Sequence, residues 1–269
     1  MTIGVFDSGL GGLSVLQSLV AIVPEYDYLY LGDNARAPYG DRSADRIYEF
    51  TQQGVEFLFS KGCVLVILAC NTASAEALRR LQQEWLPKHH PDKKILGILI
   101  PAAETLAKKY AGKKIGIIGT RATIQSHAYV REIEKRIDHL PLLEQACPLL
   151  VPLIEEGWMK TVPAKMIIKK YLRPLKSKQI SVLVLGCTHY CFIKDIITRV
   201  VGKNVVILDP GVSAARALKV YLGNHPEIEK GLSKKGSVRI YSTDTSERIR
   251  TLANKFWKKP LAIECVAIE

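Results

Sequence analysis

The amino-acid sequence predicts an α/β fold made of two similar lobes, each a largely parallel sheet flanked by helices. Short apolar runs rich in β-branched residues recur along the chain, and turn signals and a helical pattern follow them. The runs are apolar throughout, as in parallel strands that are covered on both faces. Two of the runs also end in the same way, which indicates two related lobes that face one another.

Eight runs are expected to form strands. In chain order they span residues 3–7, 28–32, 64–69, 95–100, 115–119, 182–186, 205–209 and 238–241. The clearest helix covers residues 164–175, where one apolar face is formed by Ile167, Ile168, Tyr171, Leu172 and Leu175. This helix is expected to be scaffold and to carry no site.

The strands at 64–69 and 182–186 share more than their apolar character. Each leads through a small residue to a cysteine and two polar residues, Cys70-Asn71-Thr72 in the first and Cys187-Thr188-His189 in the second. Similar buried strands are common by chance, so the shared ending is the stronger evidence that the two segments are related. The pairing suggests that the two lobes are related halves.

No linker rich in proline or serine marks a domain boundary. If the chain passes from the first lobe to the second near residue 95 and returns near residue 205, the first lobe holds both termini and the second is an insertion. The expected division is residues 1–97 with 208–269 for the first lobe and residues 98–207 for the second.

The composition is that of an ordinary globular protein with an excess of positive charge. The 269 residues are 48% hydrophobic and 24% charged, and the formal net charge is +12. That charge suits an anionic partner, whether nucleic acid, an acidic membrane or a small dicarboxylate. The basic residues are scattered and no aromatic residues interleave them, which argues for solvated faces and against nucleic-acid binding.

The amino terminus lacks the basic and apolar regions of a signal peptide, which predicts a cytoplasmic protein. The longest apolar runs are far shorter than the ~20 residues that span a bilayer, so no membrane partner is expected. In a reducing compartment the six cysteines are expected to be free thiols.

Cys70 and Cys187 are the leading candidates for chemistry. Ligands in open α/β sheets bind beyond the carboxyl ends of the strands, and both cysteines follow such ends. Capping residues and helix formers after Cys70 place it near a helix N-terminus, where the helix dipole favours the thiolate. The alternative is a small buried hydrophobic residue, the usual role of a free cysteine. Two cysteines at equivalent positions favour the chemical interpretation.

Cys191 raises the possibility of a metal site, because it forms Cys-x-x-x-Cys with Cys187 and His189 lies between them. Structural zinc usually takes four ligands in paired short spacings, and no second pair lies nearby in the sequence. A Cys187–His189 protease dyad is also disfavoured, because the two residues share one loop and no oxyanion motif accompanies them. The cysteines expected to be structural are Cys63, Cys147 and Cys265.

Two further loops could approach a ligand. Asp7 precedes a glycine-rich turn whose backbone amides could hold an anion, although Asp7 could also cap the following helix. A dinucleotide fingerprint would need glycine in place of Ser14, and a P-loop would need Gly-Lys-Ser/Thr, so nucleotide binding is the weaker interpretation. Pro38-Tyr39-Gly40 predicts a rigid turn that presents an aromatic hydroxyl or is an ordinary surface turn.

Together, four segments resemble the glutamate racemase family within the broader aspartate/glutamate racemases. They are FDSGLGG at 6–12, GDNARAPYG at 32–40, ACNTAS at 69–74 and GCTHY at 186–190, in the family's order and spacing. The resemblance extends along almost the whole chain. It implies an isomerase without cofactor or metal, with glutamate held in an active-site cleft between the lobes. It further implies that the protein supplies D-glutamate for peptidoglycan synthesis.

The resemblance also implies roles for individual residues. It assigns catalysis to Cys70 and Cys187 as paired acid/base residues, supported by Asp7, His189 and Glu155. The residues implied in substrate binding are Asp7, Ser8, Tyr39, Gly40, Asn71, Thr72, Thr188 and His189. The family pattern suggests that Cys70 acts on D-glutamate and Cys187 on L-glutamate. The neighbouring Glu156 leaves open which carboxylate supports His189.

The sequence departs from the family pattern at three places. Cys191 stands where the family often has proline, Ala122 replaces a frequent glycine, and Asp209-Pro210-Gly211 is not the commonest form. These changes bear on loop rigidity and on oxidation of Cys187 with Cys191.

Two alternatives remain open at this point. An aspartate racemase or a related acid isomerase would use the same site. A basic protein that binds nucleic acid or a protein partner on the same fold belongs to a different class. A homodimer is a further expectation.

Two thiols suit racemisation without an electron-sink cofactor, because one base cannot easily serve both faces of the α-carbon. One cysteine as thiolate removes the proton while the other as thiol delivers a proton to the opposite face. Exchanging the roles runs the reaction backward. Sulfur suits this task because a modest environmental shift brings its pKa near the working pH.

Overall fold

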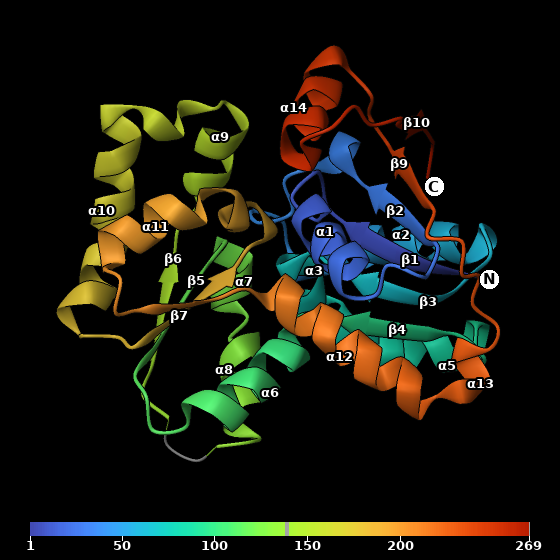
Figure 1. Cartoon of the computed structure of the whole chain (residues 1–269), viewed down its shortest axis with the longest axis horizontal. Coiled ribbons are helices and arrows are strands. Elements are labelled where there is room, and N and C mark those ends of the chain that lie inside the picture. Colours follow the sequence, from blue (N-terminus) through green and yellow to red (C-terminus); the bar gives the residue numbers. More distant parts are fainter. Residues whose placement is uncertain (138–139, 269) are drawn as a thin grey trace.

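The computed structural model describes residues 1–137 and 140–268 and contains two separate parallel sheets (Figure 1). The strands of both sheets are flanked by helices, which confirms the predicted α/β class with two similar lobes. Among the described residues, no helix is both long and apolar enough to cross a membrane.

The first sheet has six strands in the order β10-β9-β2-β1-β3-β4, all parallel to their neighbours. The strands are β1 (Thr2–Asp7), β2 (Tyr28–Gly32), β3 (Cys63–Leu68), β4 (Lys94–Gly97), β9 (Val238–Ser242) and β10 (Glu264–Cys265). The central strands β1 and β2 are almost entirely buried, as their apolar sequences predict.

The second sheet has four parallel strands in the order β6-β5-β7-β8. They are β5 (Ile115–Gly119), β6 (Leu142–Ala146), β7 (Val182–Gly186) and β8 (Val206–Leu208). The order 6-5-7-8 repeats the order 2-1-3-4 of the first sheet, so β3 and β7 occupy equivalent positions. The similar endings of these two strands therefore reflect equivalent places in two related sheets.

Helices cover the faces of both sheets, and shorter helical segments join them. The α-helices are α1 (Leu13–Ile22), α2 (Ala44–Ser60), α3 (Asn71–Glu76), α4 (Leu78–Arg80), α5 (Leu86–His89), α6 (Leu99–Tyr110), α7 (Arg121–Gln125), α8 (Ala128–Glu134), α9 (Leu150–Glu155), α10 (Val162–Ser177), α11 (Lys194–Val201), α12 (Pro210–Asn224), α13 (Pro226–Glu229) and α14 (Glu247–Trp257). The remaining segments are the 3-10 turns η1 (Asn34–Arg36), η3 (Trp158–Lys160) and η4 (Thr188–Ile193) and the π-helical turn η2 (Leu81–Trp85).

The chain passes between the sheets at α6 and α12. Helix α6 leads from β4 to β5, while α12 follows β8 and packs against both α1 and α6 (Figure 1). Strand β8 belongs to the second sheet and ends at Leu208, and β9 returns to the first. The proposed lobe limits, residues 1–97 with 208–269 and residues 98–207, stay a prediction.

Most expected elements are present, and two details were wrong or missing. The strand expected at 95–100 ends at Gly97, because Leu99 already begins α6. Strands β6 and β10 were not predicted; β6 is half-buried and contains Glu144 and Gln145, so it lacks the apolar pattern of the other strands. The helix expected at 164–175 is confirmed as part of α10, with Ile168 and Leu172 fully buried.

Candidate active site

All predicted site residues except Asp7 line one cavity beyond the carboxyl ends of β1, β3 and β7, and Asp7 lies behind its wall in contact with Thr188. Strand β1 ends at Asp7, Cys70 follows β3, and Cys187 follows β7. The cavity has a volume of about 40 Å³ and is lined by Ser8, Gly9, Ala37, Pro38, Tyr39, Gly40, Cys70, Asn71, Thr72, Thr120, Val151, Glu155, Cys187, Thr188 and His189. The carboxyl ends of parallel strands lie along one edge of a sheet, which brings the residues after β1 and β3 together, and Cys187 reaches the same cavity from the second sheet.

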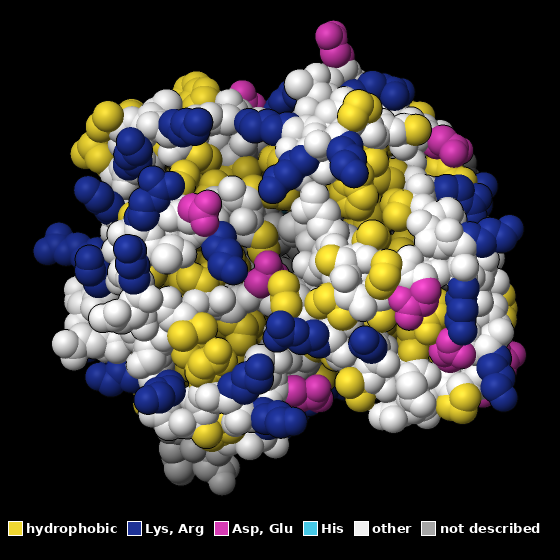
Figure 2. All heavy atoms as spheres, in the orientation of Figure 1, with side chains coloured by type: hydrophobic (Ala, Val, Ile, Leu, Met, Phe, Trp, Pro, Cys, Tyr) yellow, Lys and Arg dark blue, Asp and Glu magenta, His cyan; other side chains and the backbone are white. Residues whose placement is uncertain are grey.

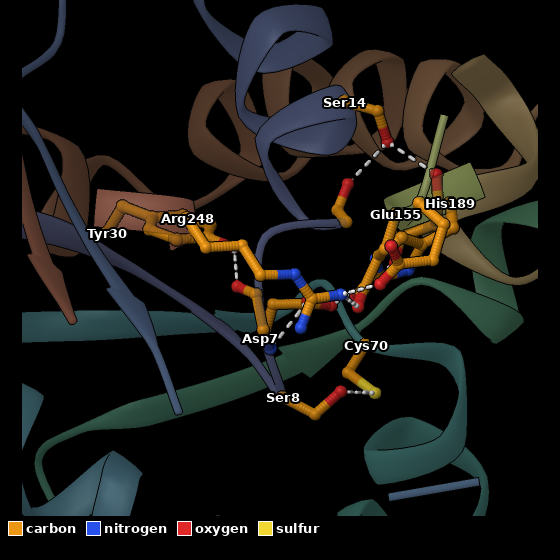
Figure 3. Close-up of polar contacts among 12 residues, drawn as sticks. Asp7, Ser8, Ser14, Tyr30, Cys70, Glu155, His189 and Arg248 are labelled. Carbon is orange, nitrogen blue, oxygen red and sulfur yellow. Dashed lines mark hydrogen bonds and ion pairs between the residues drawn. The ribbon is translucent and has the colours of Figure 1, made fainter. Parts of the chain in front are cut away.

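Cys70 is the N-cap of α3 and is only 5% exposed. Its Sγ atom accepts a hydrogen bond from the backbone N–H of Ala73 at 3.4 Å and lies 3.4 Å from Oγ of Ser8 (Figure 3). Burial and the nearby Asp7 carboxylate raise the pKa of Cys70 to about 11, although both hydrogen bonds act in the opposite direction. The N–H of Ala73 at the start of α3 lowers the pKa of Cys70, in the direction expected for a helix N-terminus, but desolvation by burial is the larger effect.

Cys187 precedes η4 and is 6% exposed. Burial raises its pKa, and backbone hydrogen bonds from His189 and Tyr190 oppose that shift. Negative charge on Cys70 or Asp7 raises the pKa of Cys187 further. The two thiols therefore share one electrostatic environment, in which ionisation of one disfavours ionisation of the other.

Asp7 is fully buried, and its carboxylate accepts hydrogen bonds from the loop after β1 and from η4 after β7. The backbone N–H of Gly9 donates to Oδ2 at 3.1 Å, and the hydroxyl of Thr188 donates to Oδ1 at 3.4 Å. Burial raises the pKa of Asp7, and the charge of His189 and these hydrogen bonds oppose the shift. Asp7 thus lies in contact with the segment that carries Cys187, as well as with the loop after its own strand.

Glu155, not Glu156, contacts His189. The Oε1 atom of Glu155 lies 3.1 Å from Nε2 of His189, and Figure 3 shows the two side chains together. Burial tends to raise the pKa of Glu155, but the hydrogen bond and charge of His189, together with Arg248, hold it below its usual value. Arg248 of α14 lies 2.5 Å from Oε1 of Glu156 and 3.8 Å from Oε2 of Glu155.

Asn71 and Thr72 make contacts with the second sheet's elements. The hydroxyl of Tyr129 in α8 donates to Oδ1 of Asn71 at 2.6 Å. The Oγ1 atom of Thr72 lies 2.9 Å from Oγ1 of Thr120 and 3.1 Å from Oγ1 of Thr123. The start of α3 is therefore bonded to the residues that follow β5.

Tyr39 and Gly40 also lie at the cavity, but in different ways. The Tyr39 hydroxyl donates to Oδ2 of Asp33 at 2.5 Å, and the side chain is 1% exposed, so its hydroxyl is already bonded within the protein. A side-chain carbon at Gly40 would lie 2.8 Å from Cβ of Thr120, so glycine allows the turn to approach β5 closely.

Three residues near the site were not among the sequence predictions. Thr120 lines the cavity, and its position directly after β5 is the signal that would have identified it. Tyr129 bonds Asn71 from a helix with no recognisable motif. Arg248 reaches Glu155 from a distant part of the chain, which no local pattern indicates.

All six cysteines are free. Of the cysteines expected to be structural, Cys63 and Cys147 are buried, whereas Cys265 is exposed. Among residues 1–137 and 140–268 no group of three or more His, Cys, Asp or Glu side chains is placed to hold a metal ion.

The structure has two parallel sheets with the same order of four strands, and one cysteine from each sheet lines a shared cavity. Comparison with known proteins identifies the class to which this arrangement belongs. The family model for Asp/Glu/Hydantoin racemase matches residues 3–218, so the chain belongs to this family of isomerases.

Within the family the chain groups with the glutamate racemases. It is 38% identical to glutamate racemase of Paracoccus denitrificans, over 98% of this chain and 99% of that protein. The crystal structure of glutamate racemase isoform RacE1 from Bacillus anthracis has a TM-score of 0.89 at 32% identity, covering 99% of this chain and 97% of the other. Glutamate racemase from Francisella tularensis, solved in complex with D-glutamate, has a TM-score of 0.87 at 31% identity, with the same coverage.

Proposed function

We propose that the protein interconverts L- and D-glutamate without a cofactor, using Cys70 and Cys187 as the two acid/base groups. The observation that carries this proposal is the cavity that both cysteines line, in which the charge of one thiol disfavours ionisation of the other. Each cysteine follows an equivalent strand of its own sheet, so the two thiols approach the cavity from different lobes.

The effect of each thiol's charge on the pKa of the other supports opposite protonation states for the two cysteines during the reaction. Proton transfer across the α-carbon needs one thiolate to remove a proton and one thiol to deliver another. When Cys70 is ionised its charge holds the pKa of Cys187 high, so Cys187 keeps the proton that it must donate. After transfer the protonation states of the two cysteines are exchanged, and the reverse reaction starts from that state.

Asp7 and His189 are proposed to tune the thiols, and Glu155 to position His189. The Asp7 carboxylate raises the pKa of both cysteines, while the backbone N–H of His189 stabilises negative charge on Cys187. Glu155 binds His189 Nε2 and so fixes the orientation of the imidazole. These residues surround the thiols without needing to contact the α-carbon.

The substrate carboxylates are proposed to bind the hydroxyls and backbone amides at the start of α3 and η4. Ser8, Asn71, Thr72 and Thr188 lie on the cavity wall, where a carboxylate can accept hydrogen bonds. The cavity of about 40 Å³ is small for glutamate, so we propose that the lobes separate to admit the substrate and close again to exclude water. Exclusion of water would protect the carbanion formed during the reaction.

The proposed product suggests the cellular role. D-Glutamate made in the cytosol would supply peptidoglycan synthesis and so cell-wall formation and cell shape. Six free cysteines suit that reducing compartment. A homodimer stays a prediction.

The test is incubation of the purified protein, freed of metal and pyridoxal phosphate, with L-glutamate in D2O. Optical rotation should decay to zero while NMR shows deuterium entering the α-position. The same assay with L-aspartate separates the two substrates, since turnover of aspartate alone would identify an aspartate racemase. Turnover of neither amino acid, together with binding of nucleic acid that weakens with salt, would favour a binding protein instead.

A further inference from the structure

A second hollow lies away from the catalytic cavity, between α10 and α11. This α10–α11 groove has a volume of about 1040 Å³ and is lined by Met159, Lys160, Lys165, Lys169, Leu172, Arg173, Lys176, Ser177, Phe192, Ile193, Asp195, Ile196, Arg199 and Val200. It shares no lining residue with the catalytic cavity. Its size is at the upper end of the range of small-molecule sites.

The groove is strongly basic. Its cationic side chains are Lys160, Lys165, Lys169, Arg173, Lys176 and Arg199, and the single acidic one is Asp195. None of these cations forms an ion pair with a residue in the described part of the chain. Figure 2 shows Lys and Arg side chains gathered on both sides of hydrophobic side chains over α10 and α11. Lys176 and Arg199 donate hydrogen bonds to the backbone carbonyls of Val200 and Asp195, but no carboxylate of the described residues neutralises the positive charge of the groove.

The spacing of the cations indicates an anion larger than one phosphate. Lys165, Lys169 and Arg173 follow one another at four-residue intervals, so they lie along the same face of α10. With Lys176 they extend over about 16 Å of helix at 1.5 Å per residue. Arg199 of α11 lines the opposite wall, which provides a planar donor suited to phosphate.

Between the cations the groove offers apolar surface. Leu172 and Ile193 are buried beneath it, and Phe192 and Ile196 are half-buried. A site for inorganic phosphate alone would not need such surface, whereas a ligand with an organic body would cover it. The hollow shape also fits a small molecule better than a flat bilayer surface.

We propose that the α10–α11 groove binds a small phosphorylated molecule that carries several negative charges and an apolar or planar body. The phosphates bind the cations of α10 and Arg199, and the organic body lies on Phe192 and Ile196. A nucleotide and a short phospholipid share this chemistry. The proposal is independent of the racemase reaction, because no residue of the catalytic cavity takes part.

Isothermal titration calorimetry on the full chain tests the proposal with four probes: ADP, pyrophosphate, adenosine and dihexanoyl phosphatidic acid. At least one of ADP and the phosphatidic acid should bind saturably and about tenfold more tightly than pyrophosphate or adenosine, because it combines charge with an organic body. Tighter binding of ADP would identify a nucleotide site, and tighter binding of the lipid would identify a headgroup site.

The double variant Lys165→Glu with Lys169→Glu should weaken this binding about tenfold or more, since it places two anions beside the ligand's own charge. The matched control is Lys88→Glu with Lys219→Glu, which makes the same charge change at exposed lysines outside the groove. Circular dichroism of both variants verifies that they fold.

Three results would overturn the proposal. One is the absence of saturable binding by both organic phosphates. Another is equal weakening by the groove variant and the control, which would mean that net charge and not the groove attracts the ligand. The third is tighter binding of a short single-stranded RNA than of ADP or the phosphatidic acid, which would assign the groove to nucleic acid.

Discussion

Gly11 faces Thr188 so closely that a side-chain carbon at Gly11 would lie 2.2 Å from Oγ1 of Thr188. The same carbon would lie 2.4 Å from Nδ1 of His189. We predict that Gly11→Ala pushes the segment after Cys187 out of place and lowers kcat/KM for glutamate about tenfold to 100-fold. It should also lower the free energy of unfolding by about 1–3 kcal/mol. Steady-state polarimetry and urea denaturation measure the two effects.

Gly223→Ala is the matched control for this substitution. Gly223 lies in α12, and a side-chain carbon there would have no neighbour within 4 Å. Alanine in a helix is more stable than glycine by about 0.5–1 kcal/mol, so this variant should be slightly more stable and fully active. If Gly11→Ala were as active as Gly223→Ala, close contact with Thr188 would have no part in catalysis.

The cysteine pair gives the second prediction. Cys70→Ser and Cys187→Ser should each lower racemisation of glutamate in both directions by about 100-fold to 10,000-fold, because a hydroxyl is a poor substitute for a thiol in proton transfer. Circular dichroism at a wavelength where glutamate absorbs follows the conversion of either enantiomer.

Cys265→Ser supplies the comparison, because Cys265 is exposed and lies outside the cavity. This variant should keep the activity of the unmodified protein. Full activity in either Cys70→Ser or Cys187→Ser would rule out the two-thiol scheme.

The strands and the thiol pair could be predicted from the sequence because both depend on local signals. Buried parallel strands are apolar throughout, and the sequence itself shows a cysteine after each of two similar apolar runs. The half-buried strand β6, with Glu144 and Gln145, has no such pattern. Strand β6 takes the place in the second sheet that β2 has in the first, as the orders 6-5-7-8 and 2-1-3-4 show. That correspondence becomes visible only in the folded chain.

Contacts between distant segments explain the rest of what the sequence did not predict. The bond from Tyr129 to Asn71 and the approach of Arg248 to Glu155 join residues that no motif relates. The raised pKa of Cys70 is likewise a consequence of tertiary burial, whereas the sequence showed only the neighbouring helix N-terminus.

The pKa of Cys70 leads to the third prediction. With that pKa at about 11, the thiolate is the minor form at neutral pH, and its fraction rises about tenfold per pH unit. If Cys70 is the base for D-glutamate, kcat/KM for D-glutamate should rise steeply between about pH 7 and about pH 9. Initial rates at constant ionic strength measure this profile, and a flat or falling profile would contradict it.

The raised pKa of Cys70 also makes the free energy of unfolding depend on pH, because the folded and unfolded states bind different numbers of protons. A thiol whose pKa is raised in the folded state binds more protons there than in the unfolded state once the pH exceeds the ordinary value of 9.0. The free energy of unfolding therefore falls as the pH rises from about 9 toward about 11, and rate measurements belong below that range.

Neighbouring glutamates provide the last prediction, because only Glu155 contacts His189. Glu155→Gln removes the charge that faces the imidazole, and a partly buried hydrogen bond to a charged group is worth about 1.5–3 kcal/mol. We expect kcat to fall about tenfold to 100-fold with a smaller change in KM, since Glu155 acts through His189.

Glu156→Gln makes the same chemical change one residue away, where the carboxylate binds the exposed Arg248 instead, and should leave kcat within about twofold. Equal effects of the two substitutions would show that the charge of this turn, and not its contact with His189, influences the reaction.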